Sequence, residues 1–266
     1  MIKQASEKWL TYKPIKFIVI TFVVTWVCAF FSGYQTMFDY STILGWTLLT
    51  FINFIQSASP LLAALILLRH YLFADKKFLK YVFGSNPKMI PCLVVVLLFA
   101  FQFFTFYFFG LSKDEFSISK FLSILGVQIL LGGGLEEGGW RGYLQPALEK
   151  KFHVAIAVII VSLIWVMWHL PYFFLPGNHQ GTNFLMYTLT CVAISFALTA
   201  IHKLTKSVLI CTLFHGLVNT LAIGIGANFK NNIFVLMVVS QTIFSIVLCL
   251  SSDLFILFPN KKHGNF

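Results

Sequence analysis

Residues 154–175 read VAIAVIIVSLIWVMWHLPYFFL, a run of 22 residues without a single Asp, Glu, Lys or Arg. A helix needs about 20 predominantly apolar residues to cross the core of a bilayer. Similar runs recur along the chain. Hydrophobic residues make up 58% of the 266 residues and charged residues 11%, against roughly 25% charged in soluble domains. The sequence therefore predicts an integral membrane protein.

The apolar runs predict the fold class, an all-α polytopic bundle of about eight spanning helices. The expected spans are 15–33, 43–68, 89–110, 121–140, 154–175, 184–201, 207–227 and 232–258. The polar connections between them are too short to build a soluble core, so residues 1–266 are interpreted as a single membrane domain. The five cysteines fall inside expected spans at spacings that match no zinc or disulfide framework, which favours packing roles.

The positions of the basic residues predict the orientation, because cytoplasmic loops carry the excess of Lys and Arg. Alternate connections hold 16 of the 19 Lys and Arg residues, and the other connections hold only Lys113, Lys120 and Lys230. Both termini are therefore expected in the cytoplasm. The same scatter excludes a nucleic-acid partner, which needs basic residues gathered on one face. On the opposite side, His179 lies in a loop rich in Gly and Asn and is expected to be exposed.

Two adjacent acidic residues stand out in the stretch 132–143, GGGLEEGGWRGY, because a charged side chain at bilayer depth is costly. Glu137 and Arg141 are four residues apart with the acid first, the favourable orientation for a helical ion pair. Glu136 points about 100° away from Glu137 on a helix and has no local cation, so it is the candidate base. The glycines around it are costly inside a helix, and they would let a substrate strand approach.

Two further polar positions interrupt later apolar helices. His169 follows Trp165 by one turn, so the indole can hold the imidazole in one rotamer. His215 precedes Asn219 by one turn, and both can point at one object. Taken singly, each His also suits a satisfied core residue or a hydrogen-bond clamp between helices. Three such sites in one small bundle favour a function.

Two chemistries fit these residues, and both hydrolyse a peptide bond. In the first, Glu136, His169 and His215 hold a divalent metal such as zinc, whose bound water attacks the peptide carbonyl. In the second, Glu136 with His169 activates water directly, and His215 with Asn219 donates hydrogen bonds to the oxyanion. Two other classes of function remain open: a non-catalytic immunity or regulatory membrane protein, and a proton-coupled transporter that uses these groups as a relay.

Together the motifs resemble a known family. The pattern is Glu-Glu-x-x-x-Arg from Glu136, an aromatic residue followed four positions later by His169, and His-x-x-x-Asn from His215, with GYLQP after Arg141. It is similar to the CPBP family, the CAAX proteases and bacteriocin-processing enzymes also called the Abi family, which includes the CAAX prenyl endopeptidases of the Ras-converting type. The motifs extend over about residues 131–220, and the family catalytic region is placed at about 121–227. The second motif usually begins with Phe, where this chain has Trp165.

The resemblance implies a membrane endopeptidase of glutamate or metalloprotease type. It implies that Glu136 is the catalytic glutamate, supported by Glu137 and Arg141, and that His169 is its partner. His215 and Asn219 would stabilise the oxyanion or belong to a metal site. The expected partners are membrane lipids and a peptide or lipidated-protein substrate cleaved near its C-terminus or at the membrane boundary. We expect a multi-pass protein of a bacterial plasma membrane whose active site opens to the cytoplasm.

Overall fold

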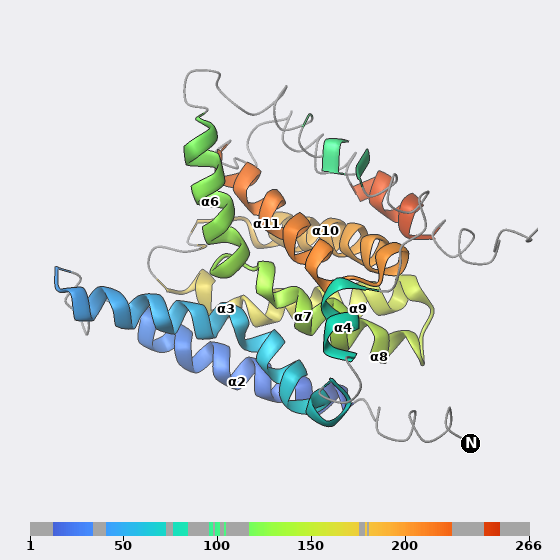
Figure 1. Cartoon of the computed structure of the whole chain (residues 1–266), viewed down its shortest axis with the longest axis horizontal. Coiled ribbons are helices and arrows are strands. Elements are labelled where there is room, and N and C mark those ends of the chain that lie inside the picture. The colour runs from blue at the N-terminus through green and yellow to red at the C-terminus, as the bar shows by residue number, and fades with distance from the viewer. Residues whose placement is uncertain are drawn as a thin grey trace, which may run out of the picture.

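The computed structural model describes residues 13–33, 41–72, 77–84, 96–97, 99–101, 104, 117–175, 179, 181–224 and 242–250. Within these residues every regular element is a helix, so the predicted all-α class is confirmed. The helices gather into one bundle (Figure 1). Buried apolar side chains form a core shared by its first helices and by the segments that follow Glu136.

The first two long helices lie side by side (Figure 1). Helix α2 spans Pro14–Gly33 and α3 spans Ile43–Leu72. Pro60 lies inside α3, where its ring packs against Gly139, at which a side chain would collide with Pro60. A proline inside a helix removes one backbone hydrogen bond. Because Gly139 has no side chain, α3 can pack directly against the glycine-rich segment that follows Glu137.

The remaining elements build the other half of the bundle. They are α4 (Lys77–Phe83), α6 (Ile118–Leu130), the 3₁₀ turn η2 (Gly134–Glu136), α7 (Glu137–Gly139), the π-helical turn η3 (Trp140–Leu144), α8 (Gln145–Glu149), α9 (Val154–Trp168), the 3₁₀ turn η4 (Leu170–Phe173), α10 (Phe184–Thr205) and α11 (Val208–Gly224). Helix α10 packs between α9 and α11, and α6 packs on α11. The site described below lies where η2, α9 and α11 approach one another.

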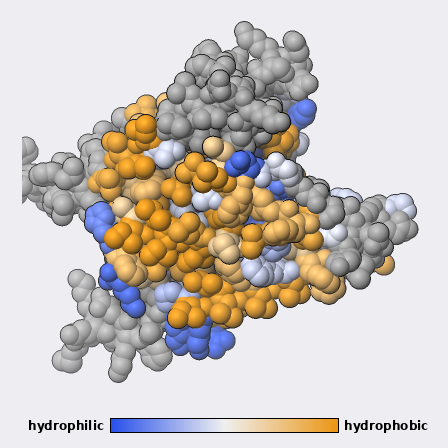
Figure 2. Space-filling model, turned by 180° about the vertical axis from the view of Figure 1, so that it is seen from behind, coloured by the Kyte–Doolittle hydropathy of each residue, from blue (hydrophilic) through white to orange (hydrophobic). Residues whose placement is uncertain are grey.

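The surface has the character expected for contact with lipid. Three unbroken helices are long and apolar enough to cross a membrane: Pro14–Gly33, Ile43–Leu72 and Phe184–Thr205. The stretch Ile118–Glu149 meets the same criteria of length and composition, although it is interrupted after Leu130. Val154–Trp168 and Val208–Ile223 are shorter apolar helices. Large apolar side chains are exposed along α2, α3 and α6, and most of the coloured surface in Figure 2 is hydrophobic. Such a surface would aggregate in water, and it fits a protein whose solvent is the bilayer.

Two predicted spans differ in the structure. The helix expected over 121–140 is broken, because α6 ends at Leu130 and the chain turns at Gly133, where φ is +116°. Only glycine adopts such a φ readily. The span expected over 154–175 ends its α-helix at Trp168 and continues as the 3₁₀ turn η4, which holds Pro171. The chain thus changes from an α-helix before His169 to a 3₁₀ turn after it.

Other predictions can be checked only in part. Most of the expected spans 89–110 and 232–258 lies outside the described residues, as do Cys92 and Asp253, although 242–250 is helical. Cys191, Cys211 and Cys249 are buried and Cys28 is half-buried, and none of these four forms a disulfide, which agrees with packing roles.

Candidate active site

Glu136 is the central acidic residue of the site and is only 4% exposed. Its Oε2 accepts hydrogen bonds from two indoles, the Nε1 of Trp165 at 2.6 Å and the Nε1 of Trp140 at 3.1 Å. Trp140 follows Glu136 by one turn, whereas Trp165 comes from α9. A buried carboxylate must be hydrogen-bonded or paired to be tolerated. The two indoles satisfy one oxygen of Glu136 and hold the carboxyl group in a fixed orientation.

The other oxygen of Glu136 faces the space beside Gly133. A Cβ atom placed on Gly133 would lie 3.1 Å from Oε1 of Glu136 and 2.9 Å from Nε2 of His215. Both polar atoms therefore border the small volume that glycine leaves open by having no side chain. The candidate base and the second histidine therefore lie beside one common point.

Glu137 pairs with Arg141, as the sequence predicted. Nη1 of Arg141 lies 3.2 Å from the carboxylate of Glu137, and both side chains are fully buried. Oε1 of Glu137 also accepts a hydrogen bond from Nδ1 of His215 at 2.8 Å. Glu137 thus supports the site by holding the imidazole of His215, a role like that of the carboxylates that orient catalytic or metal-bound histidines.

One ion pair of the site is fully buried. The guanidinium of Arg141 compensates the carboxylate of Glu137. Buried charges are tolerated when they are paired and hydrogen-bonded. With Nδ1–H given to Glu137, Nε2 of His215 lies beside Gly133, where it accepts a hydrogen bond in the neutral ring and donates one when both ring nitrogens carry protons.

His169 lies at the C-terminal end of α9. Its Nδ1 is 2.9 Å from the carbonyl oxygen of Trp165. A carbonyl only accepts hydrogen bonds, so Nδ1 must carry the proton and the neutral ring keeps a lone pair on Nε2. The ring of Trp165 lies 5.5 Å from the ring of His169 and 5.2 Å from that of His215, measured between centroids. Trp165 therefore joins Glu136, His169 and His215 in one cluster.

Asn219 contacts the glycine turn that precedes Glu136. Its Nδ2 donates a hydrogen bond to the carbonyl oxygen of Gly132. The contact joins α11 to the turn that precedes Glu136, and it holds that turn next to His215. Asn219 thus positions the glycine segment, and the sequence prediction that it contacts the oxyanion stays a prediction.

Aromatic residues enclose His169 beyond Trp165. The rings of Trp168, Tyr172, Tyr187 and His179 have centroids 4.5, 5.7, 5.5 and 5.9 Å from that of His169. The prediction that His179 is exposed is wrong, because its ring is partly buried against Tyr187 at 4.7 Å. Desolvation in this position lowers the pKa of His179. The loop folds back onto the site because its aromatic partners offer an apolar surface, which the local Gly and Asn content does not reveal.

The described residues do not fit a metal site. No group of three His, Cys, Asp or Glu side chains in the described part of the chain is arranged to hold a metal ion. Oε2 of Glu136 accepts two indole N–H groups and Nδ1 of His215 is bonded to Glu137, which leaves Oε1 of Glu136 and Nε2 of His215 as the atoms that a metal would use. No step of the reaction is therefore derived through a metal.

These features define a class of protein: an integral membrane protein that holds a carboxylate and two histidines in a buried cluster. Comparison with known proteins shows which family this chain resembles. Residues 118–221 match the model of the family described as Type II CAAX prenyl endopeptidase Rce1-like. CAAX prenyl protease 2 of Methanococcus maripaludis is 26% identical over 230 residues, which are 78% of this chain and 83% of that protein.

Residues 118–221 are thus similar to the CAAX prenyl endopeptidase family, and the resemblance inferred from the motifs is confirmed. The matched region contains all of the candidate residues, from Glu136 to Asn219. It leaves α2 and α3 outside. The family is one of membrane endopeptidases, and this agrees with a buried site built around a carboxylate and two imidazoles.

Proposed function

We propose that this protein hydrolyses a peptide bond within or at the edge of the membrane, with a water molecule activated by Glu136 and His169. The observation that supports the proposal most strongly is the shared space at Gly133, which Oε1 of Glu136 and Nε2 of His215 both border. A base on one side and a donor on the other is the arrangement that water attack on a carbonyl requires.

The residues would act in the following order. Glu136, held by Trp140 and Trp165, accepts a proton from water while the lone pair on Nε2 of His169 accepts its second hydrogen bond. The hydroxide formed attacks the peptide carbonyl carbon. His215 donates Nε2–H to the carbonyl oxygen as it becomes negative. Glu136 then returns the proton to the departing amine, so that the enzyme ends in its starting state.

The family resemblance supports a proposal for the substrate, and the distribution of Lys and Arg supports one for the orientation of the protein in the membrane. We propose that the substrate is a membrane-associated peptide cleaved near its C-terminus, of the kind that the name of the Methanococcus maripaludis relative indicates for that protein. Prenylated CAAX peptides are then the first substrates to test. We further propose that the protein is multi-pass in the plasma membrane, with its active site open to the cytoplasm, since the excess of Lys and Arg lies on the side of the expected termini.

A cleavage assay tests the proposal. Purified protein in liposomes is incubated with a farnesylated peptide ending in a CAAX sequence, with the same peptide without farnesyl, and with a transmembrane peptide carrying a polar C-terminal tail. We expect cleavage of at least one peptide, and a loss of about 10²-fold or more in His169→Ala, since a positioned acid or base contributes about 10² to 10⁴. Failure of the wild-type protein to cleave any of the three peptides contradicts the proposal.

The same assay separates direct activation of water from metal catalysis. After dialysis against EDTA and 1,10-phenanthroline we expect unchanged turnover, because the residues that the structure describes bring no three His, Cys, Asp or Glu side chains together in a way that would hold a metal ion. Loss of activity that added zinc restores would contradict direct activation and support the arrangement in which Glu136, His169 and His215 are ligands.

A further inference from the structure

Gln56 is a buried polar residue in the middle of α3, only 7% exposed and outside the region that matches the family. Its Nε2 donates a hydrogen bond to the hydroxyl of Tyr172. Its Oε1 lies 3.5 Å from the hydroxyl of Ser32 on α2, which donates to it. A buried amide is costly unless it is hydrogen-bonded. The two contacts fix the orientation of the amide, with the nitrogen toward Tyr172.

Tyr172 lies three residues after His169, in η4, and is 8% exposed. Its ring packs on His169 and on Trp168, with centroids 5.7 and 6.2 Å apart. A phenol oxygen that accepts a hydrogen bond from an amide keeps its own O–H for another acceptor. Tyr172 can therefore donate beside His169.

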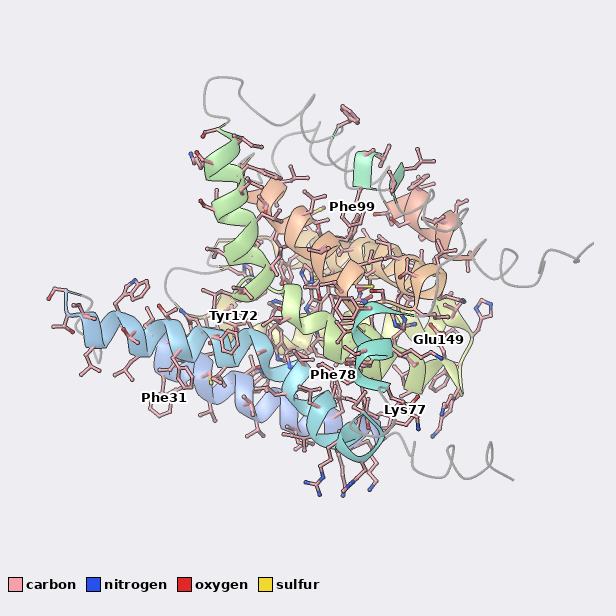
Figure 3. The ribbon with its side chains drawn as sticks, in the orientation of Figure 1. Phe31, Lys77, Phe78, Phe99, Glu149 and Tyr172 are labelled. Carbon is pink, nitrogen blue, oxygen red and sulfur yellow. The ribbon has the colours of Figure 1, made fainter. Side chains whose placement is uncertain are left out.

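Helix α3 is fixed against the segment that carries the acidic residues. Pro60 and Leu61 occupy the positions where side chains on Gly139 and Gly138 would stand. Gln56 lies about one helical turn before Pro60. Helix α3 thus packs against the segment that follows Glu136 through Pro60 and Leu61, and it contacts the segment that follows His169 through the hydrogen bond from Gln56 to Tyr172. Figure 3 shows the labelled Tyr172 beside α3, in agreement with the hydrogen bond to Gln56.

We propose that Tyr172 is a further catalytic residue, whose O–H donates to the substrate carbonyl oxygen together with His215, and that Gln56 is its positioning residue. This inference rests on the proposed hydrolysis. An oxyanion is commonly bound by two donors aimed at the position where charge develops. Nε2 of His215 supplies one donor on the α11 side, and the phenol of Tyr172 supplies the second from the α9 side.

The test uses the peptide that the wild-type protein cleaves. Tyr172→Phe keeps the ring and removes the donor, so we expect kcat to fall about 10²-fold while KM stays within about twofold. Gln56→Leu is expected to lower kcat about tenfold, because the hydroxyl of Tyr172 loses the hydrogen bond that fixes its position. The double variant should be no slower than Tyr172→Phe, because residues that act through one group are not additive. The midpoint of thermal unfolding of Tyr172→Phe should fall, because the buried amide of Gln56 loses a hydrogen-bond partner, so kcat is compared at equal folded protein.

Tyr143→Phe is the matched control, because its hydroxyl accepts the backbone N–H of Lys13 at 2.7 Å, away from the site. It should keep the wild-type kcat. Unchanged kcat in Tyr172→Phe, together with an inactive Glu136→Gln, would overturn this inference and leave the proposed hydrolysis standing. Full activity of Glu136→Gln would overturn the hydrolysis itself. Additive losses in the double variant, or a loss in Tyr172→Phe explained by a smaller folded fraction, would overturn the role of the Gln56 and Tyr172 pair.

Discussion

Glu136→Gln is expected to lower the rate of peptide hydrolysis by about 10³-fold or more, since a general base contributes about 10² to 10⁴ and the amide cannot take a proton from water. Glutamine has nearly the same shape, so the packing around the buried side chain is preserved. Only one carboxyl oxygen, Oε2, is used by Trp140 and Trp165. The oxygen that the substitution makes unreactive is therefore the one that faces Gly133.

Glu149→Gln is the matched control for this prediction. Glu149 lies on α8, continuous with the segment of Glu136, and its Oε1 accepts a hydrogen bond from Gln145 at 2.8 Å. We expect this variant to keep the activity of the wild type. Turnover in Glu136→Gln within tenfold of the wild type, measured at equal folded protein, would remove Glu136 from the role of base.

Gly133→Ala is expected to lower turnover by about 10²-fold or more. The new methyl group would lie 2.9 Å from Nε2 of His215 and 3.1 Å from Oε1 of Glu136, and it would fill the space assigned to water and substrate. A displacement of about 1 Å in a catalytic group can cost 10²-fold. The φ of +116° adds strain, which we expect to lower the free energy of unfolding by about 1 to 3 kcal/mol.

Gly126→Ala separates the effect on the site from the effect of losing a glycine. Gly126 lies in α6, and a Cβ there would meet no atom within 4 Å. This variant should keep full activity and gain up to about 1 kcal/mol, because alanine favours a helix. Steady-state kinetics and thermal unfolding of both variants make the measurement. Equal activities of Gly133→Ala and Gly126→Ala would show that the space at Gly133 is not the reaction site.

Much of the fold follows from local composition. Apolar runs predicted helices where α2, α3, α10 and α11 lie, because a membrane span is recognised from its own residues. The i, i+4 spacing likewise predicted the ion pair of Glu137 and Arg141, which the structure confirms. The break at Gly133 was not predicted from the sequence, because the glycines lie within an apolar run that predicts a continuous helix. The turn depends on a contact from α11, the hydrogen bond from Asn219 to the carbonyl oxygen of Gly132.

The sequence predicted which residues form the site, but few of the contacts between their side chains. Glu136, His169 and His215 were singled out because each is a costly polar group in an apolar helix, and the structure gathers them around Trp165. The hydrogen bond from Trp140 to Glu136 could have been expected from its one-turn spacing. The contact of Gln56 with Tyr172 joins residues 116 positions apart, and no local pattern in the sequence indicates it.

The most direct test of the central claim is to run the cleavage assay in water enriched in ¹⁸O and to weigh the products by mass spectrometry. If Glu136 activates water, the new carboxyl group of the N-terminal product gains one ¹⁸O atom in the wild-type reaction, and this product is missing with Glu136→Gln. Labelled product at the same rate from both proteins, or cleavage that incorporates no ¹⁸O, would contradict the account.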